Sequence, residues 1–143
     1  NTVSRGAHVR RSHKLTRGVR PKISGMLRVE TWKGSNCTSR IAESSKNCIH
    51  AAVWPHFRFC FEPHNVQGAA LLSRGLWEAP VTSLVENALH LGPDAVFMDV
   101  GANFGWFTTF AASLGHRVIA IEPGRIFQCY VMHNARLNNA AAR

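Results

Sequence analysis

Asp99-Val-Gly-Ala-Asn-Phe-Gly105 is the stretch of this sequence that decides the fold. It follows the apolar run 95–98, and a second apolar run, 117–121, ends immediately before Glu122. Short apolar runs on either side of a glycine turn and a helix-forming segment are typical of a βαβ unit with buried parallel strands. The sequence therefore predicts strands at 95–98 and 117–121, joined by a helix over 104–114.

The residues of the turn indicate which ligand such a unit would bind. In a nucleotide-binding βαβ unit, an acidic residue at the end of the second strand accepts hydrogen bonds from ribose hydroxyls, and Glu122 has this position. A dinucleotide-binding turn presents glycine amides to a pyrophosphate, whereas this turn begins with the carboxylate of Asp99. Because a carboxylate repels a pyrophosphate but attracts an ammonium and a sulfonium, the turn favours S-adenosylmethionine.

Two longer stretches resemble the FkbM-type S-adenosylmethionine-dependent methyltransferases: Val96-Phe-Met-Asp-Val-Gly-Ala-Asn-Phe-Gly-Trp-Phe-Thr108 and Gly115-His-Arg-Val-Ile-Ala-Ile-Glu-Pro123. Upstream, Gly75-Leu-Trp-Glu78 is similar to a segment that these proteins carry before the cofactor domain. The resemblance covers about half of the chain. It implies an α/β fold, the Rossmann-like doubly wound sheet of a class I methyltransferase, which would be incomplete in this chain.

The resemblance also implies a set of cofactor-binding residues. The turn would contact the methionine and adenosine moieties of S-adenosyl-L-methionine, Glu122 would bind the ribose, and Glu78 would approach the cofactor. The expected set is Asp99, Gly101, Ala102, Asn103, Gly105, Glu122 and Glu78. The implied reaction is O-methylation of a sugar or another small hydroxylated molecule without a metal, and the sequence assigns neither the catalytic base nor the methyl acceptor.

Other interpretations remain open at this point. Each residue of the turn has a purely structural explanation as well, because glycines form turns, asparagine caps helices and charged residues end strands. A nicotinamide-dependent oxidoreductase would use the same ribose carboxylate, although Asp99 and Asn103 replace glycines that a pyrophosphate prefers. Outside the enzymes, the alternative is a truncated non-catalytic remnant or a binding module.

Charge and composition divide the chain into three expected segments. Residues 1–33 carry nine Lys or Arg and one acidic residue, which accounts for most of the formal net charge of +9. Residues 1–35 lack a sustained apolar period and are predicted to be a basic disordered arm: a linker, part of a transit sequence, or a contact arm for nucleic acid or anionic lipid. Residues 36–77 are expected to form a pre-domain segment with short strands, and residues 78–143 a truncated half of the methyltransferase domain. Because the basic residues gather in the arm, nucleic acid is not the expected substrate.

Further elements are predicted around the βαβ unit. A short strand is expected within 54–61, and a pair of short strands within 66–76. Ser83-Leu-Val-Glu86 has the form of a capping box and predicts the start of a helix, while a final helix is predicted over 125–138. A remnant with only two parallel strands would expose apolar surface that a complete doubly wound sheet covers.

The cysteines and histidines suggest no metal site. The four cysteines form no Cys-x-x-Cys pair, and the histidine separations match no familiar ligand pattern; His56 and His64 receive no role. The sequon Asn36-Cys-Thr38 fits a lumenal or secreted protein in which two of the first three cysteines pair, and free thiols with a chance sequon are the alternative.

No run of eighteen apolar residues occurs, so no membrane span is expected. A secretory lumen and an organelle both stay open as locations, and oligomeric state is not indicated.

Overall fold

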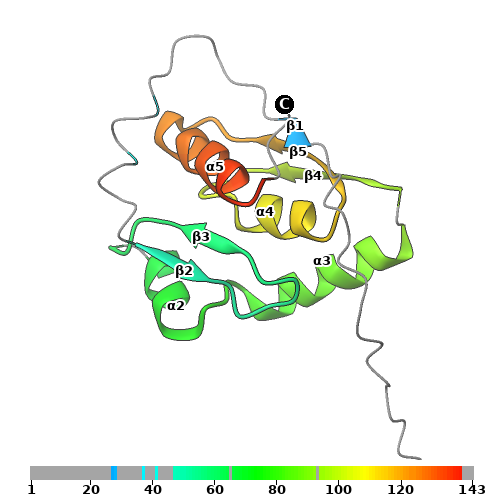
Figure 1. Ribbon diagram of the computed structural model, residues 1–143, viewed down its shortest axis with the longest axis horizontal. Coiled ribbons are helices and arrows are strands. Elements are labelled where there is room, and N and C mark those ends of the chain that lie inside the picture. The colour runs from blue at the N-terminus through cyan, green and yellow to red at the C-terminus, as the bar shows by residue number, and fades with distance from the viewer. Residues whose placement is uncertain are drawn as a thin grey trace, which may run out of the picture.

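Two small sheets organise the part of the chain that the structure, a computed structural model, describes: residues 27–28, 37, 41, 47–64, 66–92 and 94–139. The parallel sheet has the strand order β1-β5-β4 (Figure 1). Its strands are β1 (Leu27–Arg28), β4 (Val96–Val100) and β5 (Arg117–Ile121). The second sheet is an antiparallel hairpin of β2 (Cys48–His50) and β3 (Arg58–Cys60). The expected α/β class is confirmed.

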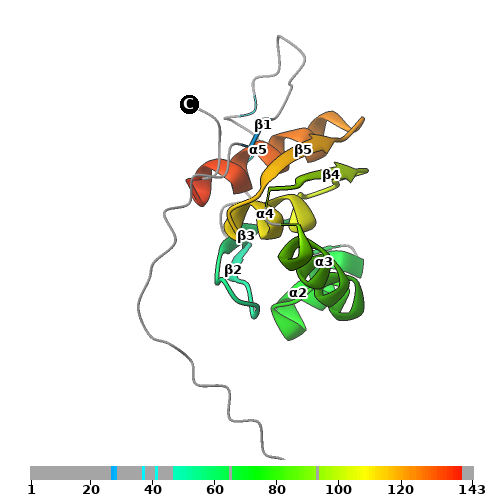
Figure 2. The ribbon, with the colours of Figure 1, turned by 90° about the vertical axis from the view of Figure 1, so that its right-hand side faces the viewer.

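Four helices accompany these sheets in the described residues: α2 (Val66–Arg74), α3 (Ala79–Leu91), α4 (Trp106–Ser113) and α5 (Arg125–Leu137). Helix α4 lies between the β4–β5 pair and the β2–β3 hairpin, as the two perpendicular views show (Figures 1 and 2). None of the described helices has both the length and the apolar character that crossing a bilayer would require. The arrangement makes α4 the central element of the described structure.

The predicted unit β4–α4–β5–α5 is present with nearly the expected bounds. Strands β4 and β5 pair in parallel, from Val96 opposite Arg117 to Val100 opposite Ile121. Phe97 and Val118 lie opposite each other on the face of the sheet that packs against the helices, and Val118 is buried. The short apolar runs and the glycine turn between them thus form the structure that their pattern indicates.

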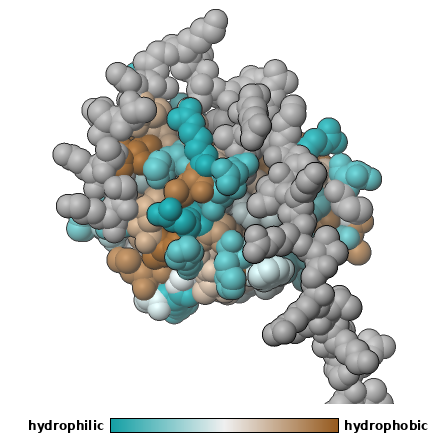
Figure 3. Space-filling model, in the orientation of Figure 1, coloured by the Kyte–Doolittle hydropathy of each residue, from teal (hydrophilic) through white to brown (hydrophobic). Residues whose placement is uncertain are grey.

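The opposite face of this pair exposes apolar side chains. Alternate residues of a strand point to opposite faces, and the outward-facing residues here remain substantially accessible. They are Val96, Met98, Val100, Ile119 and Ile121, of which Val100 is 72% exposed. Figure 3 shows apolar side chains (brown) that reach the surface on the face of the molecule it draws. The expected exposure of apolar sheet surface is therefore observed.

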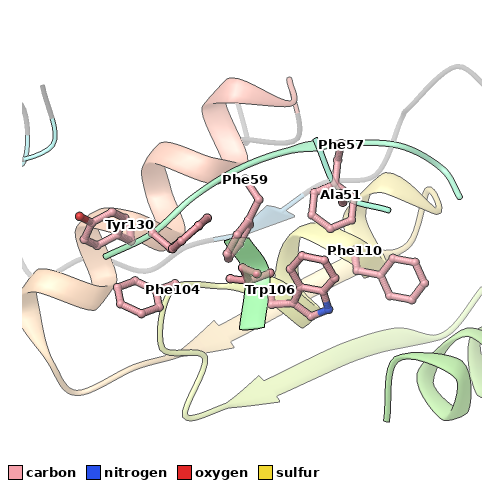
Figure 4. Close-up of a cluster of buried hydrophobic side chains, with 9 residues drawn as sticks. Ala51, Phe57, Phe59, Phe104, Trp106, Phe110 and Tyr130 are labelled. Carbon is pink, nitrogen blue, oxygen red and sulfur yellow. The ribbon is translucent and has the colours of Figure 1, made fainter. Parts of the chain in front are cut away.

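An aromatic core joins the hairpin to α4 (Figure 4). The Trp106 ring lies 5.1 Å from the ring of Phe57 and 5.2 Å from that of Phe59, measured between centroids. Phe57 immediately precedes β3 and Phe59 lies within it, two residues further along, so the two rings share one face of the hairpin. Trp106 is fully buried and is the first residue of α4. The hairpin consequently fixes the start of α4, directly after the glycine turn.

Asn134 of α5 and Asn138, the residue that caps this helix, attach α5 to the outer edge of β3. Asn134 accepts a hydrogen bond from the Cys60 amide at 2.8 Å and donates to the Cys60 carbonyl at 2.9 Å. One helical turn later, Asn138 makes the same two bonds to the backbone of Arg58, at 2.9 and 2.7 Å. The side chains complete the hydrogen bonding of an edge strand, which is how α5 is held against the hairpin.

Two of the predicted elements are wrong. Residues 66–76 do not form short strands, because they contain α2, whose Ala-Ala-Leu-Leu sequence has high helix propensity. Helix α3 begins at Ala79 and includes Ser83, so the apparent capping box lies inside the helix. Pro80 in the first turn was the better start signal, since proline tolerates the first positions of a helix and its missing amide costs nothing there.

Both pairs of cysteines form disulfides, which resolves the alternative of free thiols. Cys48 pairs with Cys60 across the hairpin, as the expectation of one pair among the first three cysteines allows. Cys37 pairs with Cys129 on α5, a pairing that the sequence did not indicate. In the basic arm, Leu27–Arg28 pair with β5, which was not expected, and the rest of the arm and Asn36 lie outside the described residues.

Candidate functional site

The candidate site is the turn that follows β4, at the carboxyl end of the parallel strands. Gly101, Asn103 and Gly105 all have positive φ, at 80°, 53° and 85°. The amides of Gly101 and Ala102 both donate to the Ile121 carbonyl, at 2.8 and 3.2 Å. These two bonds fix the turn against the last residue of β5, and glycine supplies the left-handed conformations that other residues adopt only with strain.

Glu122 lies at the edge of this turn, as the spacing predicts. Its Oε2 accepts a hydrogen bond from the Asn103 amide at 2.7 Å, and its Oε1 accepts one from the Gly124 amide at the same distance. The Glu122 carbonyl accepts a third bond from the side chain of Gln128 on α5, at 2.6 Å. The carboxylate is thus held in one orientation while the residue remains half-buried.

Asp99 is buried beneath the turn, so its explanation as a solvated strand end is wrong. Its Oδ2 accepts bonds from both the amide and the hydroxyl of Thr108, at 2.9 and 2.5 Å. Burial raises the pKa of Asp99, the Thr108 bonds oppose that rise, and the negative charge of Glu122 adds to it. The Thr108 amide belongs to the first turn of α4, where a negative charge interacts favourably with the helix dipole.

The two outer glycines of the turn have different surroundings. A Cβ on Gly105 would lie 3.2 Å from the Cα of Val131 and 3.1 Å from its Cγ2, so the turn packs closely on α5 there. A Cβ on Gly101 would meet nothing within 4 Å. Gly105 therefore permits close helix packing, whereas Gly101 borders open space at the ends of the strands, where ligands bind in open α/β sheets.

Glu78 precedes α3 in a left-handed conformation, with φ of 40°. Next to it, the Trp77 carbonyl accepts a hydrogen bond from the Thr82 hydroxyl at 2.8 Å. That hydroxyl accepts one from the Trp106 indole at 3.1 Å. This chain of bonds ties the segment before α3 to the first residue of α4, but no hydrogen bond among the described residues joins the Glu78 side chain to the turn.

The structure therefore brings six of the seven expected residues together: Asp99, Gly101, Ala102, Asn103, Gly105 and Glu122. Sequence reasoning missed Thr108, although a threonine in the first turn of the helix after an acidic strand end is a signal that could have found it. Left-handed conformations of residues other than glycine occur at Glu78, Asn103 and Asn139 in the described part of the chain. Two of these three are expected cofactor-binding residues, and such strained residues concentrate at functional sites.

A second group of side chains lies apart from the turn. Ligand atoms of Cys48, Cys60 and His133 all lie within 4.8 Å of one another. Burial lowers the pKa of His133, and the positive charges of Arg58 and Arg136 lower it further. The sequence offered no signal for this group, because it depends on the register of the hairpin and on the packing of α5.

Comparison of the chain with protein-family models, with curated proteins and with solved structures found no match.

Proposed function

We propose that the chain contains the first half of an FkbM-like, Rossmann-like methyltransferase domain that binds S-adenosyl-L-methionine. Parallel pairing of β4 and β5 and the helices α4 and α5 support this architecture. The exposed apolar face of the sheet supports it as well, because doubly wound sheets are covered by helices on both faces. In this proposal the two strands are neighbours in a larger parallel sheet.

One observation carries the proposal: the Glu122 carboxylate lies 2.7 Å from the Asn103 amide. This contact joins the end of the second strand to the glycine turn after the first, which is the arrangement that binds the ribose of adenosine-type ligands. An ionised carboxylate has about four acceptor positions. Glu122 can therefore keep its two amide bonds and accept further bonds from ribose hydroxyls.

The charges of the site favour a cationic ligand over a dinucleotide. Asp99 and Glu122 are close enough for their negative charges to repel each other, which contributes to the raised pKa of Asp99. A ligand that carries an ammonium and a sulfonium would reduce this repulsion, whereas a pyrophosphate would add two more negative charges. The same pair of carboxylates therefore supports S-adenosylmethionine more than a nicotinamide cofactor.

The proposed reaction is O-methylation of a sugar or another small hydroxylated molecule. When bound, S-adenosylmethionine supplies an activated methyl group for attack by a hydroxyl. The residues of the turn would contribute mainly by holding the cofactor in one orientation, which lowers the entropic part of the barrier. Loss of the hydroxyl proton requires a base, for which no described residue is assigned.

The test is titration of S-adenosylmethionine, S-adenosylhomocysteine and NAD into the folded protein by calorimetry. We expect saturable binding of the two adenosyl ligands and none of NAD. Glu122→Gln and Asp99→Asn should weaken binding at least about tenfold, equivalent to about 1.4 kcal/mol. Glu86→Gln, a change on α3 away from the turn, is the matched control and should bind as the wild type does.

Absence of binding by folded protein would overturn the proposal, and binding of NAD alone would favour the oxidoreductase. Transfer of a labelled methyl group to a panel of sugars is a separate measurement. The protein could bind S-adenosylmethionine and still transfer no methyl group to any sugar of the panel. If every form of the protein that includes the described residues behaves in this way, the non-catalytic binding module is favoured.

A further inference from the structure

The group formed by Cys48, Cys60 and His133 has the composition of a metal site. The three residues come from β2, β3 and α5, and their potential ligand atoms lie within 4.8 Å of one another. Cys60 is fully buried, while Cys48 and His133 are half-buried. In the structure the two sulfurs are joined in a disulfide. The group can therefore bind a metal only when that bond is reduced.

The backbone holds these three residues together independently of the disulfide. Cys48 and Cys60 are directly opposite in the hairpin, with their Cα atoms 4.0 Å apart. Backbone hydrogen bonds lie on either side of this pair, since the Ala51 amide donates to Phe57 and the Phe61 amide donates to Asn47. In the folded hairpin, this register places the two sulfurs side by side through contacts that do not involve the S–S bond.

His133 is positioned by its neighbour in α5. Asn134 bonds both the amide and the carbonyl of Cys60, and it donates a further bond to the Phe104 carbonyl at 2.9 Å. These bonds lie in the buried interior and do not involve sulfur. After reduction, they would keep the histidine beside both thiols, so the site would be largely formed before a metal arrives.

Two thiolates and one imidazole are a typical ligand set for zinc. Zinc binds cysteine sulfur at about 2.3 Å and histidine nitrogen at about 2.0–2.1 Å, in a tetrahedron whose fourth position water can fill. Arg58 and Arg136 act on His133 through their positive charges. Because Zn²⁺ with two thiolates has no net charge, the positive charges of these arginines would repel the bound metal only weakly.

We propose that Cys48, Cys60 and His133 bind one zinc ion when the Cys48–Cys60 disulfide is reduced, so that the site responds to redox conditions. A low-molecular-weight thiol supplies the two electrons. Its thiolate attacks the sulfur of Cys48, the S–S bond breaks, and Cys60 leaves as a thiolate. A second thiol then releases Cys48 and forms the oxidised disulfide of the reductant. Zinc binds both thiolates, and the two protons of the reductant thiols pass to solvent.

The test uses Cys37→Ser/Cys129→Ser protein, in which only the Cys48–Cys60 pair remains. After reduction and removal of the reductant without oxygen, Zn²⁺ is titrated by calorimetry and Co²⁺ by absorption. We expect one equivalent of each metal to bind, with the near-ultraviolet thiolate-to-cobalt band and the visible bands of tetrahedral cobalt. The oxidised protein should bind neither metal at this site.

Three variants distinguish zinc binding at the three-residue site from nonspecific zinc binding to exposed thiols. Cys60→Ser and His133→Ala should each weaken zinc binding by more than the roughly 10–100-fold that loss of an outer partner costs. His90→Ala, on α3, is the matched histidine control and should bind like its parent. Equal affinity in the His133→Ala and His90→Ala proteins, or no binding by reduced protein, would overturn the proposal.

Reduction could also unfold the protein, and the inference stays testable in that case. Zinc should then restore helical circular dichroism to the reduced parent and to His90→Ala, but not to His133→Ala. Failure of zinc to restore structure in the parent would overturn the proposal. Neither result depends on S-adenosylmethionine, so this inference stands or falls separately from the proposed function.

Discussion

Asn134 of α5 and Cys60 of β3 are joined by two hydrogen bonds, in which one side-chain amide replaces a neighbouring strand. Asn134 is completely buried, and its loss would leave the amide and carbonyl of Cys60 without these partners. A buried group that loses its partner costs about 1–3 kcal/mol. Asn138 makes the equivalent bonds to Arg58 at an exposed position, where water can replace them.

We therefore predict that Asn134→Ala lowers the free energy of unfolding by about 3 kcal/mol, whereas Asn138→Ala lowers it by less than about 1 kcal/mol. Urea denaturation followed by circular dichroism measures both. Equal losses in the two variants would show that burial does not determine the strength of this attachment.

The two outer glycines of the turn give a second comparison. Gly101→Ala should cost about 1–2 kcal/mol, because alanine is strained at a φ of 80° although space is available. Gly105→Ala has the same backbone strain, and its Cβ would also press on Val131. The Gly105 variant should therefore be the less stable of the two in thermal unfolding. If they are equally stable, Val131 moves aside without cost.

Asp99 predicts a specific dependence of stability on pH. Its folded-state pKa is raised above 3.8, mainly by burial, so the folded protein takes up this proton at a higher pH than the unfolded chain does. The ionised group therefore destabilises the fold above its folded-state pKa, and this cost is relieved as the pH falls through that pKa toward 3.8.

Asp99→Asn removes this titration, and it should be at least as stable as the wild type at pH 7. The advantage of the variant should shrink as the pH falls toward 3.8, which urea denaturation at several pH values can follow. A difference between the two proteins that does not change with pH would contradict the assignment. In the proposed function, the same variant binds S-adenosylmethionine more weakly despite its stability.

Thr82 connects the Glu78 segment to the turn through Trp106. Thr82→Val keeps the shape of the side chain but leaves the buried Trp106 indole without its acceptor. We expect a loss of about 1–3 kcal/mol in unfolding free energy. Ser73→Ala, at an exposed position on α2 where the hydroxyl bonds only the local backbone, is the control and should change stability little. If Glu78 contributes to cofactor binding as proposed, Thr82→Val should also weaken that binding.

The exposed sheet face predicts self-association. Met98 is 57% exposed, so Met98→Lys should change stability by less than about 0.5 kcal/mol and should reduce concentration-dependent association in sedimentation velocity. Val118, on the opposite face, is 1% exposed, and Val118→Lys should prevent folding. Unchanged sedimentation of Met98→Lys would show that this apolar face does not mediate association.

The sequence predicted the structure best where the local pattern of apolar residues matches the element that those residues form in the fold. The runs 95–98 and 117–121 are short, apolar and bounded by glycine or charge, and both became strands. The position of Glu122 at the turn followed from spacing alone, since the carboxyl ends of adjacent parallel strands lie together. These features depend on residues that are close in sequence or joined by one βαβ unit.

Long-range features could not be predicted in the same way. The burial of Asp99 depends on Thr108 and on how α4 packs, and a sequence shows only that an acid ends a strand. The 66–76 segment is apolar and short, so its periodicity did not distinguish strands from helix α2. Pairing of Cys37 with Cys129 depends on contacts between segments 92 residues apart, for which spacing gives no rule.

That disulfide has a consequence for cleavage of the chain. Cys37 and Cys129 close a covalent ring that contains the hairpin, the glycine turn and strands β4 and β5. A protease that cuts once anywhere inside this ring produces two polypeptides that remain attached to each other. Such a nicked molecule would run as one band on a gel without reductant and as two bands with it, so the fragments would separate only under reducing conditions.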